Sequence, residues 1–188
     1  VQAMVIPIQQ RKEGVLEMAQ AVKDALAKAG IRVKLDDTDK SPGWKFAEQE
    51  MRGIPIRVEL GPKDIEAGKC VIVRRDTGEK IEVALTEAAA KAVELMEVIQ
   101  KDMFARAKAH RDSHITDVRS YAAFKDAVEN KPGFSRAMWC GDEACENKIK
   151  EDTTATSRCM PFEQEQISDV CVCCGKPAHK LVYWGKAY

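Results

Sequence analysis

The chain has 188 residues, 45% of them hydrophobic and 32% charged, and its 30 Lys and Arg are balanced by 30 Asp and Glu. This length allows one large domain or two small ones, and the mixed composition argues against a disordered tail. A net charge of zero excludes a globally basic nucleic-acid-binding domain and leaves open a local basic site.

No stretch of the sequence approaches 18 consecutive apolar residues, which excludes a transmembrane helix. The start of the chain has neither the basic region nor the small-residue cleavage site of a signal peptide. We therefore expect a cytoplasmic protein without membrane contact. The chain begins without Met inside an expected strand, which suggests a fragment of a longer protein.

The first 36 residues alternate between strand-like and helix-like patterns. Residues 1–8 are a short apolar run, and residues 14–29 carry apolar side chains at helical spacing. Residues 31–36 then alternate between apolar and polar, as a half-buried strand does. This order predicts a βαβ unit with a parallel pair of strands.

The following segments extend this unit to an α/β domain. A helix is predicted over residues 44–51, with Ser41 as its N-cap and Pro42 in its first turn. A third strand is expected at residues 54–60, and residues 61–64 have turn chemistry. Residues 69–75 and 80–85 are predicted to form the two strands of a hairpin. A long helix is predicted from about residue 87 onward. Residues 1–112 are thus predicted to form a five-stranded mixed sheet with three flanking helices.

The sequence pattern changes beyond residue 111. An amphipathic helix is predicted over residues 117–130, and a strand-like segment lies at residues 180–184. Short segments among the Cys residues connect the two. Because this region offers too little apolar surface for a large core, residues 113–188 are predicted to form a second, smaller α+β domain.

Six of the seven Cys residues follow residue 139. An odd number of Cys without a secretion signal makes a disulfide framework improbable, and clustering favours metal binding. Cys140 and Cys145 enclose four residues, and Cys171 and Cys174 enclose two. Two such pairs fit tetrahedral zinc at about 2.3 Å per sulfur. A closed four-sulfur site has no open position, so one zinc per chain would be structural.

The spacing alone leaves the ligand set open. Cys173 adjoins Cys174 and should point away from a site with knuckle spacing, and Cys159 could be a spare thiol. The alternative to a metal site is a group of buried or unrelated Cys residues without metal.

Charged residues are dense between Arg32 and Lys80, with eleven Lys and Arg and ten Asp and Glu. A solvated charged face is the ordinary interpretation of such a mixture. The alternative is a surface in which carboxylates accept hydrogen bonds from guanine N1 and N2 while Lys and Arg hold phosphate or O6. No phosphate-binding Gly-rich loop, Ser/His/Asp set or nucleophile elbow is found, so no catalytic residue is predicted.

Three blocks of sequence carry a resemblance to a known family. They are residues 41–46 with 50–64, residues 139–142 with 153–162, and residues 171–178 with 185–188. The first resembles the anticodon-binding domain shared by a subgroup of class II aminoacyl-tRNA synthetases. The other two resemble the zinc domain of prolyl-tRNA synthetases of the archaeal and eukaryotic type. Together the blocks extend over essentially the whole chain.

The resemblance implies a role for particular residues. It implies anticodon contacts at Glu50, Arg57, Lys63 and Asp64. Lys80, in the predicted hairpin, is a weaker candidate for the same role. The resemblance implies zinc ligands, the same four that the spacing favours, at Cys140, Cys145, Cys171 and Cys174. It also implies that the C-terminal Tyr188 is directed toward a catalytic domain.

The function that the resemblance implies is recognition of the tRNA(Pro) anticodon by a fragment of an ATP-dependent prolyl-tRNA ligase. The motifs that bind ATP and proline lie upstream in the family, so ATP would be bound only by that catalytic domain. The fragment is expected to be a monomer and the full-length enzyme a homodimer. The alternative is a free-standing accessory module that uses the same fold to bind a protein or to regulate an enzyme.

Overall fold

A computed structural model describes residues 1–187. The chain divides into two compact units, which we call the first unit, Val1–Ala105, and the second unit, Arg106 onward. A five-stranded sheet lies in the first and a four-stranded sheet in the second. Within residues 1–187, no helix is both long and apolar enough to cross a membrane. The predicted domain limits, 1–112 and 113–188, stay a prediction.

The sheet of the first unit has the strand order β2-β1-β3-β4-β5. Its strands β1 and β3 are parallel to one another, as are β1 and β2, whereas β4 and β5 are antiparallel to their neighbours. The predicted five-stranded mixed sheet is therefore confirmed. The strand bounds are β1 Ala3–Pro7, β2 Val33–Leu35, β3 Ile56–Leu60, β4 Lys69–Arg74 and β5 Lys80–Ala84.

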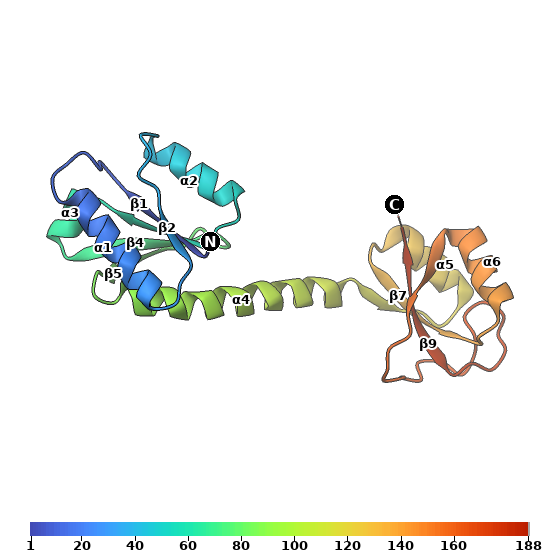
Figure 1. The fold of residues 1–188 in the computed structure, drawn as a ribbon. Helices are drawn as coiled ribbons and strands as arrows, with labels where there is room; N and C mark the ends of the chain where they lie inside the picture. The colour runs from blue at the N-terminus through green and yellow to red at the C-terminus, as the bar shows by residue number, and fades with distance from the viewer. Residues whose placement is uncertain (188) are drawn as a thin grey trace. The chain divides into compact units, whose positions relative to one another are not determined.

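Helices pack on both faces of this sheet (Figure 1). On one face, α1 (Val15–Lys28) and the first part of α4 (Ala88–Ser113) bury apolar side chains in one cluster with strand residues such as Val5, Val58 and Ile72. On the other face, α2 (Pro42–Met51) places Phe46 against Met4 and Ile6 of β1. The side chain of Ser41 accepts a hydrogen bond from Trp44 N, as its predicted role as N-cap requires.

One prediction for the first unit was wrong. Residues 61–64 do not form a simple turn, because a short helix, α3, runs over Pro62–Glu66. The Asp64 carboxylate accepts a hydrogen bond from Gly61 N at 2.9 Å and so caps this helix, and Pro62 stands at its first position.

The sheet of the second unit has the order β6-β7-β9-β8. Its helix α5 (Tyr121–Asn130) begins four residues later than predicted, because Ser120 caps it by accepting a hydrogen bond from Ala123 N. The C-terminal strand β9 (Lys180–Lys186) is longer than the predicted segment. Four elements of this unit were not predicted from the sequence: β6 Ile115–Asp117, β7 Phe134–Trp139, α6 Glu143–Thr153 and β8 Ala155–Cys159.

The core of the second unit has two parts. Phe124 and Trp184 are fully buried and meet edge to face, with ring centroids 5.9 Å apart. A smaller cluster groups Met138 and Leu181 with Cys145 and Cys171. Gly133, with φ 134°, has no room for a side chain, since a Cβ there would lie 2.0 Å from His114 O.

Candidate functional site

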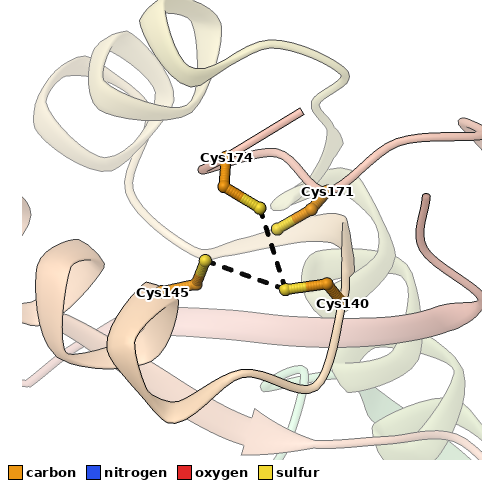
Figure 2. A group of neighbouring side chains, drawn as sticks. All are labelled: Cys140, Cys145, Cys171 and Cys174. Carbon is orange, nitrogen blue, oxygen red and sulfur yellow. Dashed lines mark hydrogen bonds between the residues drawn. The ribbon is translucent and has the colours of Figure 1, made fainter. Parts of the chain in front are cut away.

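Four Cys side chains of the second unit point toward a common centre (Figure 2). Cys140 directly follows β7, and Cys145 lies in the first turn of α6. Cys171 and Cys174 come from the loop before β9, where Val170 and Pro177 form an isolated β-bridge. One pair of thiols thus comes from the end of β7 and the start of α6, and the other pair comes from the loop before β9.

The sulfur positions match the geometry of a tetrahedral metal site. The Sγ of Cys140 lies 3.7 Å from that of Cys145 and 3.8 Å from that of Cys174. All four Sγ atoms lie within 4.8 Å of one another. Four sulfurs at about 2.3 Å from a tetrahedral zinc ion would be about 3.8 Å apart. The residues present therefore fit a metal bound by four thiolates.

Backbone hydrogen bonds hold the Cys171–Cys174 loop in place. Gly175 N donates to Cys171 O at 3.0 Å and closes a tight turn, in which Gly175 has φ 73°. Cys171 N donates to Lys176 O at 2.7 Å. Val172 N donates to Met138 O at 2.9 Å, which attaches the loop to β7, the strand that directly precedes Cys140.

Three of these thiols have shifted pKa values in the protein chain alone. Burial opposes ionisation of Cys171, but backbone hydrogen bonds at Cys174, Cys173 and Cys140 lower its pKa to about 7. Burial raises the pKa of Cys140 and that of Cys145. A bound cation favours thiolates, so metal binding would release protons from this group.

The remaining thiols lie outside the four-sulfur group. Cys173 is half-buried and packs against both apolar clusters of the second unit, and burial raises its pKa. Cys159 is exposed on β8. Cys70 is buried in the first unit, where desolvation raises its pKa to about 11.

A second candidate site lies on the face of the first sheet that α2 covers in part. In the register of the strands, Arg57 of β3 is opposite Val73 of β4, and Val73 is opposite Lys80 of β5. Directly opposed residues point to the same face of a sheet. Arg57 and Lys80 therefore lie in one row across three strands, about 10 Å apart at about 4.8 Å per strand.

Arg57 is held firmly on this face. Its Nη1 donates to Glu50 Oε1 at 2.5 Å, and its Nε donates to Glu59 Oε1 at 2.6 Å. The guanidinium lies over the ring of Phe46, 4.5 Å from the centroid. Burial opposes the charge of Arg57, but the hydrogen bonds with Glu59 and Glu50 outweigh it and raise the pKa. The side chain of Arg57 is 12% exposed and that of Glu50 is 56% exposed, so Glu50 presents its carboxylate to solvent.

The structure separates the predicted residues into two groups. Glu50, Arg57 and Lys80 lie around the beginning of β3, whereas Lys63 and Asp64 lie on α3, beyond the end of β3. Asp64 already caps α3 with one carboxylate oxygen. Tyr188 lies outside the described residues.

Three further residues that were not predicted from the sequence help to build this site. Glu59 holds Arg57, and alternation along β3 could have revealed it, since residues two apart share a face. Arg75 Nε donates to Glu50 O at 2.7 Å. Gln49 lies in the same small hollow as Glu50 and Arg57, and its Oε1 has no hydrogen-bond partner among the described residues. The positions of Arg75 and Gln49 in this site depend on tertiary packing, which no local sequence pattern indicates.

Comparison with known protein families identifies both units. Residues 2–95 match the family described as "Anticodon binding domain". Residues 121–188 match the family described as "Prolyl-tRNA synthetase, C-terminal". The chain therefore belongs to the anticodon-binding domain family, and it carries the C-terminal domain of prolyl-tRNA synthetases.

Individual relatives match along the whole chain. It is 65% identical over 188 residues to a proline–tRNA ligase of Lachnospira eligens and 68% identical over 188 residues to one of Agathobacter rectalis. It is 58% identical over 187 residues to a proline–tRNA ligase of Clostridium botulinum strain Okra. The chain spans 39% of the length of each of these relatives. The expectation that the chain is of the archaeal and eukaryotic type is not supported by these relatives.

Proposed function

We propose that the chain recognises the anticodon of tRNA(Pro) within a proline–tRNA ligase. Relatives with that name match all of the chain, and the first unit belongs to the anticodon-binding family. The observation that carries the proposal is the geometry of Arg57, which Glu50 and Glu59 orient and the Phe46 ring supports from one side. A charged pair held this rigidly is suited to reading a base edge.

Guanine is the base that this arrangement suits. Proline anticodons carry guanine at their second and third positions, and the Watson–Crick edge of guanine has two adjacent donors, N1 and N2, beside the acceptor O6. The exposed carboxylate of Glu50 matches the donors, and a guanidinium matches the acceptor. Lys80 lies in the same row as Arg57, and Lys63 and Asp64 lie on α3, so we assign these three residues to other contacts with the same loop of RNA.

We propose further that one zinc ion is bound per chain by Cys140, Cys145, Cys171 and Cys174. The sulfur distances support this. Zinc would supply four strong bonds that connect β7, α6 and the Cys171–Cys174 loop, with no open position for a substrate. Its role is therefore structural, and it stabilises the domain that we assign to residues 113–188.

Ligation of proline to tRNA, with ATP, is the reaction we propose for the whole enzyme, in the cytoplasm. We assign that chemistry to a catalytic domain outside these 188 residues, with Tyr188 docking toward it. The chain alone is expected to be a monomer and the whole enzyme a homodimer. The chain alone should therefore show no proline-dependent exchange of pyrophosphate with ATP.

Titration with anticodon stem-loops tests the recognition. The 188-residue chain should bind a stem-loop with guanine at the second and third anticodon positions more tightly than its adenine counterparts. Glu50→Ala should reduce this preference at one position by about 1–3 kcal/mol, because one base contact is lost.

The matched control is Glu48→Ala. Glu48 lies on the same helix but pairs with Arg52 instead of Arg57, so this variant should keep the preference for guanine. Equal affinity of the unmodified chain for guanine and adenine stem-loops would refute the proposed recognition, and an unchanged preference in Glu50→Ala would remove this residue from the reading site.

A further inference from the structure

A pocket of about 490 Å³ lies at the carboxyl ends of β1 and β2 in the first unit. The loop after β1 lines it with residues from Gln9 to Lys12, and the loop after β2 with Thr38, Asp39 and Lys40. The beginning of α2 completes the wall with Pro42 and Lys45. The base-reading group around Arg57 contributes no residue to this lining.

The loops that line the pocket diverge from one another. The chain leaves β1 toward α1 on one face of the sheet and leaves β2 toward α2 on the other face. The pocket lies between these loops, at the carboxyl ends of two adjacent parallel strands. It is next to the β1–β3 position at which the strand order of this sheet reverses.

Hydrogen bonds between its walls preform the pocket. Gln10 Nε2, from the loop after β1, donates to Asp37 O at 2.8 Å and to Thr38 O at 3.2 Å, in the loop after β2. Lys45 Nζ, from α2, donates to Gln10 Oε1 at 3.0 Å and to Asp36 O at 2.8 Å. Three segments far apart in sequence are thus fixed to one another. Gln9 has φ 56°, a conformation that such constraints impose on a non-Gly residue.

The charge of the pocket is suited to an anion. Four cations line it, Arg11, Lys12, Lys40 and Lys45, against the single carboxylate of Asp39. Lys45 is 2% exposed, and the Asp36 carboxylate 3.7 Å away balances its charge, so Lys45 supports the wall and the net positive charge comes from the exposed cations. Arg11 pairs with Asp39 at 3.3 Å, where both side chains are exposed. Lys12 and Lys40 lie on exposed loops from which they can reach a ligand.

We propose that this pocket binds a phosphate of the RNA backbone next to the anticodon, an inference that rests on the proposed function. Lys45 and Glu50 lie on the same helix, about 7.5 Å apart along its axis at 1.5 Å per residue. One RNA loop can therefore reach both sites. Trp44 is 47% exposed with Lys40 Nζ 5.5 Å from its ring centroid, and it offers a base-stacking surface beside the pocket.

The test compares two double variants of the 188-residue chain with equal loss of charge. Lys12→Ala/Lys40→Ala removes two pocket cations, and Lys28→Ala/Lys101→Ala removes two exposed cations of the first unit outside the pocket. Affinity for the guanine stem-loop is measured at several salt concentrations. The pocket variant should lower the slope of log affinity against log salt by about 0.7, the value expected for the loss of one phosphate contact on a single strand. The control should keep the slope of the unmodified chain.

The preference for guanine separates this inference from the proposed function. The pocket variant should weaken guanine and adenine stem-loops by the same factor, whereas Glu50→Ala changes their ratio. A pocket variant with the slope of the control, in a chain that still discriminates guanine, overturns the inference and leaves the proposed function intact. A chain that binds stem-loops without discriminating bases refutes the proposed function, and the slope then still decides the pocket.

The source of the phosphate is tested by amide chemical shifts of Gln9–Lys12 and Thr38–Lys40, recorded with the stem-loop and with inorganic phosphate. Shifts caused by the stem-loop and lost in the pocket variant support the proposal. Shifts with inorganic phosphate but none with the stem-loop overturn the assignment to RNA. No shift with either overturns the pocket as an anion site.

Discussion

The first unit buries one large apolar cluster between its sheet and helices α1 and α4, and a small one under α2. The second unit divides its buried apolar residues between two clusters, and the smaller contains Cys145 and Cys171. Apolar burial contributes about 25 cal/mol per Å², so a larger continuous core stabilises a unit by itself. With the proposed zinc bound, the second unit would gain from metal bonds the stability that the first gains from packing.

Removing the metal should have the largest effect and should separate the units. Structural zinc contributes on the order of 10 kcal/mol in small zinc peptides, which is comparable to the whole stability of a small domain. Chelation is therefore expected to unfold the second unit and leave the first folded. Hydrogen exchange resolved along the chain measures both in one experiment. Loss of protection in both units would break the comparison.

Single Cys variants identify the ligands. Cys171→Ser and Cys174→Ser should lose the metal, because a tetrahedral site with three thiolates binds more weakly. Cys159→Ser and Cys173→Ser are matched controls that should retain one zinc per chain, since these thiols lie outside the four-sulfur group. Full zinc content of Cys174→Ser by elemental analysis would contradict the assignment.

Core substitutions should have the next largest effect. Leu60 in the first unit and Ile149 in the second are fully buried, and truncation of either to Ala should cost about 2–5 kcal/mol in its own unit. Leu60→Ala should destabilise the first unit equally with and without metal. Ile149→Ala should matter only in the zinc-bound chain, because the metal-free second unit is expected to be unfolded already. Urea unfolding with and without chelator measures both, and a metal-dependent effect of Leu60→Ala would show that the units are coupled.

The contrast also explains how much of the fold the sequence predicted. In the first unit each strand and long helix has its own apolar period, so all five strands were predicted. In the second unit α6 was missed, because Cys145 and Ile149 are its only buried residues and a single i, i+4 pair is too little to establish a helical period. The short α3 was missed because its stability comes from the cap at Gly61 and Asp64.

The candidate sites show the same division. Spacing favoured the four Cys residues, since two close pairs in a chain restrict a metal site to few arrangements, and the family resemblance implied the same four. The pocket near Lys45 could not be proposed, because its walls come from three segments connected by Gln10 and Lys45. Gln10 belongs to no motif, and no sequence spacing connects it to Lys45. Glu59 and Gln49 likewise become part of a site only through the packing of α2 on the sheet.

The smallest expected effect concerns backbone strain, with one non-Gly residue of positive φ in each unit among the described residues. Thr154, at the C-terminal end of α6, has φ 60°, and Gln9 in the first unit has φ 56°. A left-handed conformation destabilises the folded state by about 1–2 kcal/mol for a residue with a Cβ. Replacement by Gly removes this strain but costs about 0.5–1 kcal/mol, because Gly has more conformational freedom in the unfolded chain. Thr154→Gly should therefore raise the free energy of unfolding of the zinc-bound second unit by about 0.5–1 kcal/mol. Gln9→Gly should gain less, because Gln is not β-branched. A decrease for Thr154→Gly in urea unfolding would mean that the hydrogen bond from Thr154 Oγ1 to Thr153 O, at 2.6 Å, outweighs the strain.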